Sequence, residues 1–583
     1  MSQLFSKIRI GNSKRSTFDL SHNQVTTADF GQLIPICYRD MLPNDDFTVT
    51  PEAFVRLAPA ATPFYGSIKV RIHHFFVPYR LCFGSWDAFI SQSPSNFEVP
   101  PYFTVAQLRS ALEDDPQYSK DTTSGYKRGI YCKLMSNLGL NPQIFTSSLG
   151  DSNRIAAFPF LAYYRIWLDY FLDSNINDHS ALDQAFKTMV EHGGSLDAYV
   201  HDLLQYRNCC FKKDYFTTAK LSPQEGSPSR VGVDVADPDL NIGLSGSSIF
   251  TNLQLKGSNR QVSASGSSSA QQSSATSKLG QFAIEALRGA VSAQRYSERN
   301  NYVGSKIINR ILAHFGIAPS AERLDMAEFL GSESFPIAVQ DVTSHNTVSD
   351  LQDNYTTLGL GMQAGKGLGR NGRPSSVHYH AKEHGIFMTV MSILPDTAYY
   401  QGISKFWTKG VTGEPLDYFT PEFENLGYQE ILNQELYCPS IDDQVAAYQS
   451  YDPKGVFGYT PRFSEYKFAY DILGSDFVSP GNQIAQGNYG AYMDAWHLFR
   501  KLNYSEQNPL ALNNNFVTCD NTQEDFDRVF QYTDNKFDHF YFNIRVDVKA
   551  TRNMVGFAEP SIDATNMLGD GNTINLPYGG TRL

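Results

Sequence analysis

Six residues from Gly367 to Gly372 read Gly-Leu-Gly-Arg-Asn-Gly and match the glycine spacing of a dinucleotide-binding turn. That turn needs a strand before it and a helix after it, so that the pyrophosphate sits at the helix N-terminus. Here a glycine-rich run precedes the match and Pro374 follows it closely. We therefore predict a flexible, slightly basic loop at 367–372 and no bound cofactor.

Three histidines follow within seven residues and could in principle ligate a metal: His378, His380 and His384. His380 and His384 would share a face in a helix, whereas His378 and His380 would share a face in a strand. A strand is predicted directly after them. We predict that these side chains make structural hydrogen bonds and that the chain has no metal site.

The acidic side chains indicate no catalytic centre. Asp45-Asp46 and Asp442-Asp443 fall in polar turns, where neighbouring carboxylates are usually solvated. The Asp- and Asn-rich run from Asp563 to Asn572 lacks the order of an EF-hand. HExxH, GxSxG and CxxC motifs do not occur in the sequence. We predict no catalytic residue.

Charge is distributed unevenly along this 583-residue chain, whose formal net charge is −12. Lys7, Arg9, Lys14 and Arg15 all precede the first acidic residue, Asp19. Residues 1–18 therefore form a basic arm of the kind that contacts phosphates without reading sequence. A solvated terminus is the alternative interpretation. The acidic remainder argues against wrapping by nucleic acid.

The seven cysteines are odd in number and scattered, which favours reduced thiols in a chain that folds in a cytoplasm. The start of the chain is too polar for a signal peptide. The apolar run Phe158–Leu172 is short and contains Arg165 and Asp169, so it predicts a buried helix and no membrane insertion.

Strand patterns lie far apart in the sequence. Side chains alternate between apolar and polar over Ile68–Ile72 and over Phe542–Val548, while Ile386–Leu394 is almost wholly apolar, as in a strand covered on both faces. We predict a mainly β protein, an eight-stranded antiparallel jelly-roll barrel with long, partly helical insertion loops.

Helical periodicity marks the segments between these strands: Phe160–Asp173, Ser195–Tyr206, about Leu279–Arg299 and Ile307–Phe315, with Gly316 as a C-terminal stop. Residues 255–278 are rich in Ser and Gly and predict a mobile surface loop. We therefore expect a single domain over 19–583, with insertions at 90–210, 222–278 and 279–331.

Several stretches, in order along the chain, resemble the major capsid protein of the Microviridae, small icosahedral single-stranded DNA phages, and their gokushovirus branch in particular. They are Arg15–Leu81, Phe75–Phe89, Phe160–Asp173, Lys212–Gly226, Tyr302–Gly331, Glu383–Ile393, Phe457–Phe468 and Asp494–Phe499. Asp40 and Asn44 depart from the family pattern and indicate a divergent branch.

The resemblance implies a structural protein of the virion that assembles in the cytoplasm of a bacterial host. Its partners would be further copies of the chain, as pentamers and a sixty-copy T=1 shell, and circular single-stranded DNA. A small basic DNA-binding peptide, scaffolding proteins and a host surface receptor would be further partners. Residues 222–278 would form a host-facing protrusion at the three-fold axes, and the basic arm would lie inside near DNA. A β-rich protein that binds or hydrolyses carbohydrate is the alternative.

Overall fold

The computed structural model describes most of the chain between Arg15 and Met554. The described residues are 15–91, 98–114, 120–121, 125–126, 130–141, 150–226, 253–256, 261–264, 284–303, 306–317, 320, 325–343, 363–372, 374–411, 417–423, 427–438, 451–478, 493–502, 510–520, 526–531 and 538–554.

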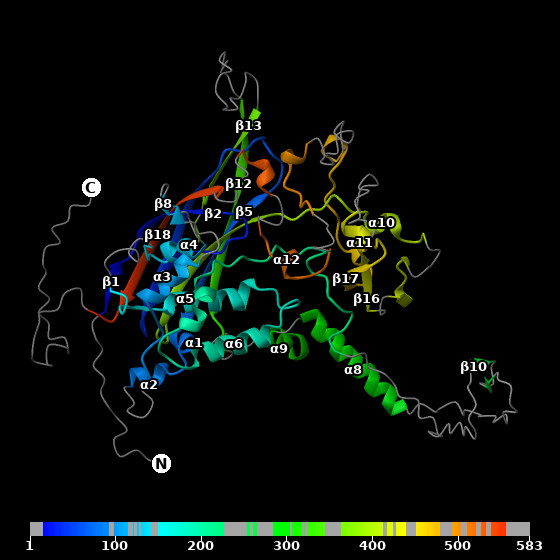
Figure 1. The fold of residues 1–583 in the computed structure, drawn as a ribbon, viewed down its shortest axis with the longest axis horizontal. Coiled ribbons are helices and arrows are strands. Elements are labelled where there is room, and N and C mark those ends of the chain that lie inside the picture. Colours follow the sequence, from blue (N-terminus) through cyan, green and yellow to red (C-terminus); the bar gives the residue numbers. More distant parts are fainter. Residues whose placement is uncertain are drawn as a thin grey trace, which may run out of the picture. The chain divides into compact units, whose positions relative to one another are not determined.

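Ten strands of the described residues form one large antiparallel sheet (Figure 1). They are β1 (Ser16–Asp19), β2 (His22–Ala28), β3 (Ile34–Met41), β4 (Asp46–Leu57), β5 (Ile68–Pro78), β12 (Glu328–Thr343), β13 (Gln363–Arg370), β14 (Val377–His380), β15 (Gly385–Pro395) and β18 (Phe540–Arg552). The order across the sheet is β1-β18-β4-β13-β12-β5-β15-β3, with β2 also paired to β18 and β14 also paired to β4.

The ten strands occupy eight positions across the sheet. β1 and β2 lie end to end along β18 in one continuous register, because Ser16 faces Arg552 and His22 faces Val546. β13 and β14 likewise share the edge of β4. The sheet therefore has the eight strand positions that the sequence analysis predicted.

The sheet curls until its two outer strands meet through side chains. The amide of Gln24 on β2 donates to the carbonyl of Pro35 on β3 over 3.4 Å, and the His22 ring lies 3.4 Å from the Ile36 carbonyl. A sheet curled so that its two edges lie close together leaves those edges less exposed to unwanted strand pairing. The predicted jelly-roll class is confirmed.

The predicted strand patterns are confirmed and extended. β18 alternates strictly, with Phe542, Ile544, Val546 and Val548 buried. Every residue of β15 is buried, because β5 and β3 flank it and both of its faces are covered. β5 runs on from the predicted Ile68–Ile72 and ends at Pro78, which has no amide hydrogen to donate.

The glycine-rich segment at 367–372 was wrongly predicted as a loop. Its first four residues belong to β13, which pairs with β12 and with β4. Gly365, Gly367 and Gly369 alternate onto the buried face of this strand. A Cβ on Gly365 would stand 2.5 Å from the Thr62 carbonyl oxygen, and one on Gly367 would stand 2.5 Å from Leu57. Close packing, and not flexibility or phosphate binding, explains these glycines.

Helices fill the segments between the strands. They are α1 (Tyr79–Cys82), α2 (Trp86–Ile90), α3 (Val105–Glu113), α4 (Ile130–Asn137), α5 (Phe158–Ile166), α6 (His179–Glu191), α7 (Val200–Leu204), α8 (Ile284–Val303), α9 (Ile307–Phe315), α10 (Lys405–Thr408), α11 (Asn433–Leu436) and α12 (Asn514–Val517). Short two-stranded sheets join β6 (Tyr102–Thr104) to β9 (Arg154–Ala156), β7 (Lys120–Asp121) to β8 (Gly125–Tyr126), β10 (Leu253–Lys256) to β11 (Gln261–Ala264), and β16 (Tyr428–Leu432) to β17 (Val456–Pro461).

One of the four predicted helices has the predicted bounds and three differ, among them α8, which runs to Val303 where about Arg299 was predicted. α9 has the predicted bounds and ends at Gly316, whose φ of 70° is left-handed. α5 passes into a π-helical turn over Trp167–Phe171. The segment predicted as a helix from Ser195 to Tyr206 is a 3-10 turn followed by the short α7.

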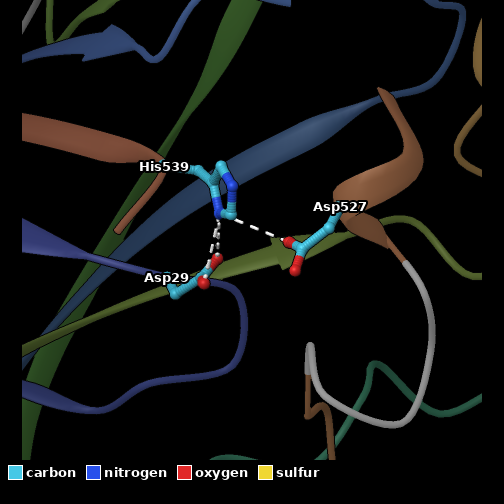
Figure 2. Close-up of side chains that lie close together, drawn as sticks. All are labelled: Asp29, Asp527 and His539. Atoms are coloured by element: carbon cyan, nitrogen blue, oxygen red, sulfur yellow. Dashed lines mark hydrogen bonds and ion pairs between the residues drawn. The ribbon is translucent and has the colours of Figure 1, made fainter. Parts of the chain in front are cut away.

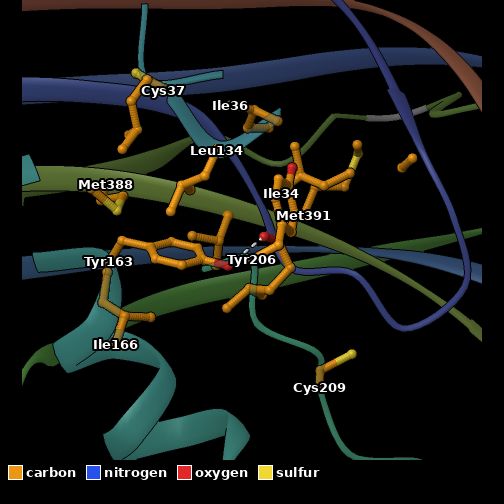
Figure 3. Packing of buried hydrophobic residues seen from close by; sticks show 14 of the residues in the cluster. Ile34, Ile36, Cys37, Leu134, Tyr163, Ile166, Tyr206, Cys209, Met388 and Met391 are labelled. Atoms are coloured by element: carbon orange, nitrogen blue, oxygen red, sulfur yellow. Dashed lines mark hydrogen bonds between the residues drawn. The ribbon is translucent and has the colours of Figure 1, made fainter. Parts of the chain in front are cut away.

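Helices α4 and α5 pack against β3 and β15, and Figure 3 shows Leu134 and Tyr163 from these helices near Met388 of β15. The Tyr163 hydroxyl on α5 donates to the Leu33 carbonyl over 2.8 Å, and the Arg207 amide donates to this hydroxyl over 3.0 Å. Arg165 on the same helix is buried and pairs with Asp169 and Asp183.

In the described part of the chain, no helix combines the length and apolar character needed to cross a bilayer.

Contacts divide the chain into two compact units, residues 222–304 and the remainder. The smaller unit holds α8 and the β10–β11 pair, and the Asn301 amide donates to the Ser222 carbonyl over 2.7 Å. The larger unit has a main core in and around the barrel and a second core around Phe216, Ile431 and Phe457.

Packing of the β13 glycines can be tested with a matched pair of variants. Gly365→Ala is expected to lower the free energy of unfolding by about 1–3 kcal/mol, because the new methyl group meets the backbone of Thr62. Gly372→Ala is the control, since nothing lies within 4 Å of its Cβ position, and it should change stability by less than about 0.5 kcal/mol. Urea unfolding curves measure both. Equal midpoints for the two variants would contradict the packing explanation.

Candidate functional site

Of the four basic residues predicted to contact DNA, Arg15 lies in the described part of the chain, and Lys7, Arg9 and Lys14 lie outside it. The Arg15 guanidinium pairs with the Asp46 carboxylate over 2.6 Å and donates to the Asn44 carbonyl over 2.7 Å. It therefore fastens the start of β1 to the start of β4.

Asp46 also receives a hydrogen bond from His380, whose Nδ1 lies 2.7 Å away. Burial alone would raise the pKa of Asp46, but the hydrogen bonds from His380 and Arg15 outweigh it and lower this pKa below its ordinary value. The structure thus brings together Arg15, Asp46 and His380, which the sequence analysis treated as separate candidates.

The preceding carboxylate, Asp45, was wrongly predicted to be solvated. It is fully buried, lies 3.2 Å from the Arg552 guanidinium, and accepts a hydrogen bond from the Leu42 amide over 2.9 Å. A carboxylate removed from water needs such partners. Asp45 and Asp46 together fasten the turn before β4 to β18 and β1. Asp442, Asp443 and the run from Asp563 to Asn572 lie outside the described residues.

The three clustered histidines have three different partners. His378 and His380 share the exposed face of β14, as expected for a strand. His378 lies 3.1 Å from the Thr48 hydroxyl, His380 contacts Asp46, and His384 packs against the Trp86 ring at 5.7 Å. His378 and His380 therefore make hydrogen bonds of the kind predicted, whereas the contact of His384 is ring packing.

A different cluster has the composition of a metal site, namely Asp29, Asp527 and His539, and Figure 2 shows His539 between the two carboxylates. The His539 Nδ1 lies 3.2 Å from Asp29 Oδ2 and 3.4 Å from Asp527 Oδ1. All three residues are buried, and the Phe530 ring stacks on the imidazole at 4.2 Å. In the described part of the chain, this is the group of three potential ligands whose atoms converge, within 4.8 Å of one another.

The distances between these side chains fit two arrangements, a metal ion bound by all three or direct contacts between them. Ligands at about 2.0–2.2 Å from a divalent cation lie roughly 3 Å or more apart, and direct hydrogen bonds between the histidine ring and the two carboxylates have similar distances. In either case the cluster joins the end of β2, the 3-10 turn Phe526–Val529 and the start of β18. Sequence reasoning missed it, because the three residues lie far apart and form no motif.

Four of the seven cysteines are thiols of low reactivity. All seven are free. Burial raises the pKa of Cys37, Cys82 and Cys209 to about 12, and that of Cys210 to about 11. A thiol with so high a pKa stays protonated near neutral pH and is a poor nucleophile.

The polar clusters described above therefore hold strands and turns together. With the curled eight-position barrel and its helical insertions, they define a structural jelly-roll protein, the class that includes virus coat subunits and lectins.

Comparison with known proteins decides between these. The family model described as "Capsid protein (F protein)" matches residues 6–562, so the chain belongs to this family of phage capsid proteins. It is 24% identical to the capsid protein VP1 of Chlamydia phage 1, over 94% of this chain and 96% of the relative. The capsid proteins VP1 of Bdellovibrio phage phiMH2K (24%; 85% and 86% covered) and of Spiroplasma virus 4 (23%; 76% and 81%) are similar in the same way.

These three phages are Microviridae, so the resemblance to the capsid protein of that family is confirmed. The chain is a structural component of the virion and not an enzyme, and membership of the family implies assembly into an oligomeric shell.

Proposed function

We propose that sixty copies of this chain form a T=1 icosahedral shell around a circular single-stranded DNA genome, by way of pentamers. Assembly takes place in the cytoplasm of the bacterial host with the help of scaffolding proteins. The observation that carries this proposal is the family match over 6–562, which spans both the barrel and its insertions.

The structure supports a shell role in two ways. In the larger unit β18 lies between β2 and β4, so strands from distant parts of the sequence complete one barrel. Its long insertions supply surface beyond the barrel for contacts with neighbours. Symmetric shells need such contacts on several sides of each subunit.

Mass and shape of the expressed protein test the shell proposal. We expect static light scattering and negative-stain microscopy to find shells, or pentamers of five times the 65.3 kDa chain mass when scaffolding proteins are left out. Monomers or dimers that gain no mass with the companion virion proteins present would contradict it.

The basic arm, residues 1–18, is proposed to lie inside the shell and contact DNA. Lys7, Arg9 and Lys14 carry the charge available for phosphates, because Arg15 already pairs with Asp46. The net charge of −12 leaves most of the genome to be neutralised by another component. We propose a small basic DNA-binding peptide for that part.

The arm can be tested by reversing its charges while leaving Arg15 in place. Lys7→Glu, Arg9→Glu and Lys14→Glu together are expected to reduce packaged DNA or to lower the salt concentration at which particles fall apart, because phosphate contacts are lost. Absorbance ratios and nucleic-acid quantification of purified particles measure this. The charge-conserving variant Lys7→Arg, Arg9→Lys, Lys14→Arg serves as the control. If the reversed variant holds as much DNA as the control and resists salt equally, the proposal is wrong.

Residues 222–278 are proposed to face the host and to protrude at the three-fold axes. In support, residues 222–304 form a compact unit by themselves, and 255–278 are rich in Ser and Gly. Except for β10 and β11, this region after Gly226 lies outside the described residues. Deletion inside a separate unit should spare the barrel.

Deletion of 255–278 is therefore expected to leave particle assembly and DNA content unchanged and to reduce adsorption to the host at least tenfold. A variant with the same residues in scrambled order controls for length and composition. Adsorption assays on purified particles give the comparison. Unchanged adsorption of the deletion particles would remove the proposed role.

A further inference from the structure

Seven large apolar side chains are exposed together around α10, in the larger unit. This aromatic patch consists of Ile403, Phe406, Trp407, Val411, Tyr418, Phe419 and Tyr466, whose exposed fractions lie between 43% and 77%. Isolated exposed apolar residues are ordinary, but a contiguous group of this kind marks an interaction surface.

Contacts link the five aromatic side chains of the patch into one continuous group. The Lys409 ammonium lies 5.5 Å from the Phe406 ring centre, 5.4 Å from that of Tyr418 and 4.1 Å from that of Tyr466. Phe406 and Trp407 are in edge contact at 5.4 Å. The buried Phe463 joins Phe419 to Tyr466, at 5.2 and 6.2 Å. The positive charge at the centre is thus covered by aromatic faces.

The patch is held in a fixed shape. The Ser404 hydroxyl accepts the Phe406 amide hydrogen at the start of α10, over 3.3 Å. Gly410 turns the chain with a φ of 75°, and its amide donates to the Asp417 carboxylate over 2.7 Å. Left-handed backbone of this kind favours glycine. Rings presented on such a turn lose little conformational entropy when they are covered.

The patch also rests on the second core. The Ile403 amide donates to the Gln434 carbonyl over 2.8 Å, and the Lys405 ammonium lies 3.6 Å from the buried Glu435 carboxylate. Figure 1 shows α10 beside α11, with β16 and β17 next to them. The exposed rings are therefore the outer side of a packed substructure.

The size and charge of the patch indicate its partner. Five partly exposed aromatic rings and two aliphatic side chains present roughly 600 Å² of apolar surface, which approaches the roughly 800 Å² that each partner contributes to a stable protein interface. Copies with a net charge of −12 repel one another, so their association needs apolar contacts of this size. A DNA-binding surface would instead carry several unshielded cations.

We propose that the aromatic patch is a contact surface for a second copy of this chain. The proposal rests on the proposed shell function and names one surface through which it operates. Trp407 and Val411, the two most exposed side chains of the patch, are assigned as its main anchors.

Truncation of the anchors tests this. Trp407→Ser and Val411→Ser should each weaken association of the purified chain, by about 30-fold for Trp407, which corresponds to about 2 kcal/mol. Ile90→Ser, at a half-exposed position on α2, is the control for loss of an exposed apolar side chain. Sedimentation velocity over a concentration series measures association, and circular dichroism with thermal unfolding checks the fold.

The possible outcomes distinguish a failure of the patch proposal from a failure of the shell proposal. If the Trp407 and Val411 variants associate as tightly as the unmodified chain, the patch is not the contact, although the shell proposal stands. If the unmodified chain does not associate even with the companion virion proteins present, both proposals fail. A photo-reactive benzoylphenylalanine at Phe406 identifies the partner in assembled particles without removing an aromatic ring. A cross-link to a second copy of this chain, seen as a product of twice the chain mass, supports the proposal. A cross-link to a different virion protein overturns it.

Discussion

The pairing of β18 with β4 is the constraint on which the rest of the fold depends. Twelve residue pairs, from Asp46 with Thr551 to Leu57 with Phe540, join a strand from early in the sequence to one from late in it, next to the edge formed by β1 and β2. β1 and β2 then add to the free edge of β18, and the Asp29, Asp527 and His539 cluster fixes the corner where β2 and β18 meet. The helical and loop insertions between β4 and β18 must leave the barrel and return to it, because the strands among them, β5, β12, β13, β14 and β15, belong to the same sheet.

This constraint explains how the chain accommodates such long insertions. The entropy cost of closing a loop grows only with the logarithm of its length, so lengthening a connection costs little once the barrel ladder is formed. The ladder, the buried apolar faces of β15 and β18, and the close packing of the β13 glycines supply the stability locally. The insertions are then available for contacts outside the barrel, as a capsid subunit requires.

Besides this framework, the chain has three chemically different regions. The arm is basic, residues 222–304 form a separate unit with a polar Ser- and Gly-rich stretch, and the aromatic patch around Lys409 is apolar. Charge suits the arm to phosphates and apolar area suits the patch to another protein surface. One chain thus carries distinct surfaces for genome, host and neighbouring subunit in the proposed function.

The sequence by itself determined the family, the jelly-roll class and the main strands, since alternation over β18 and the apolar run of β15 are local patterns with a fixed period. Only the tertiary structure decided that Gly365, Gly367 and Gly369 belong to a strand, because glycine gives no hydropathy signal and the need for it comes from Leu57 and Thr62 on neighbouring segments. The contact of Arg15 with Asp46 and of His539 with Asp29 was equally hidden. Such contacts join residues that are distant in sequence. The register of the paired strands brings them within hydrogen-bonding distance, and a local sequence pattern does not determine that register.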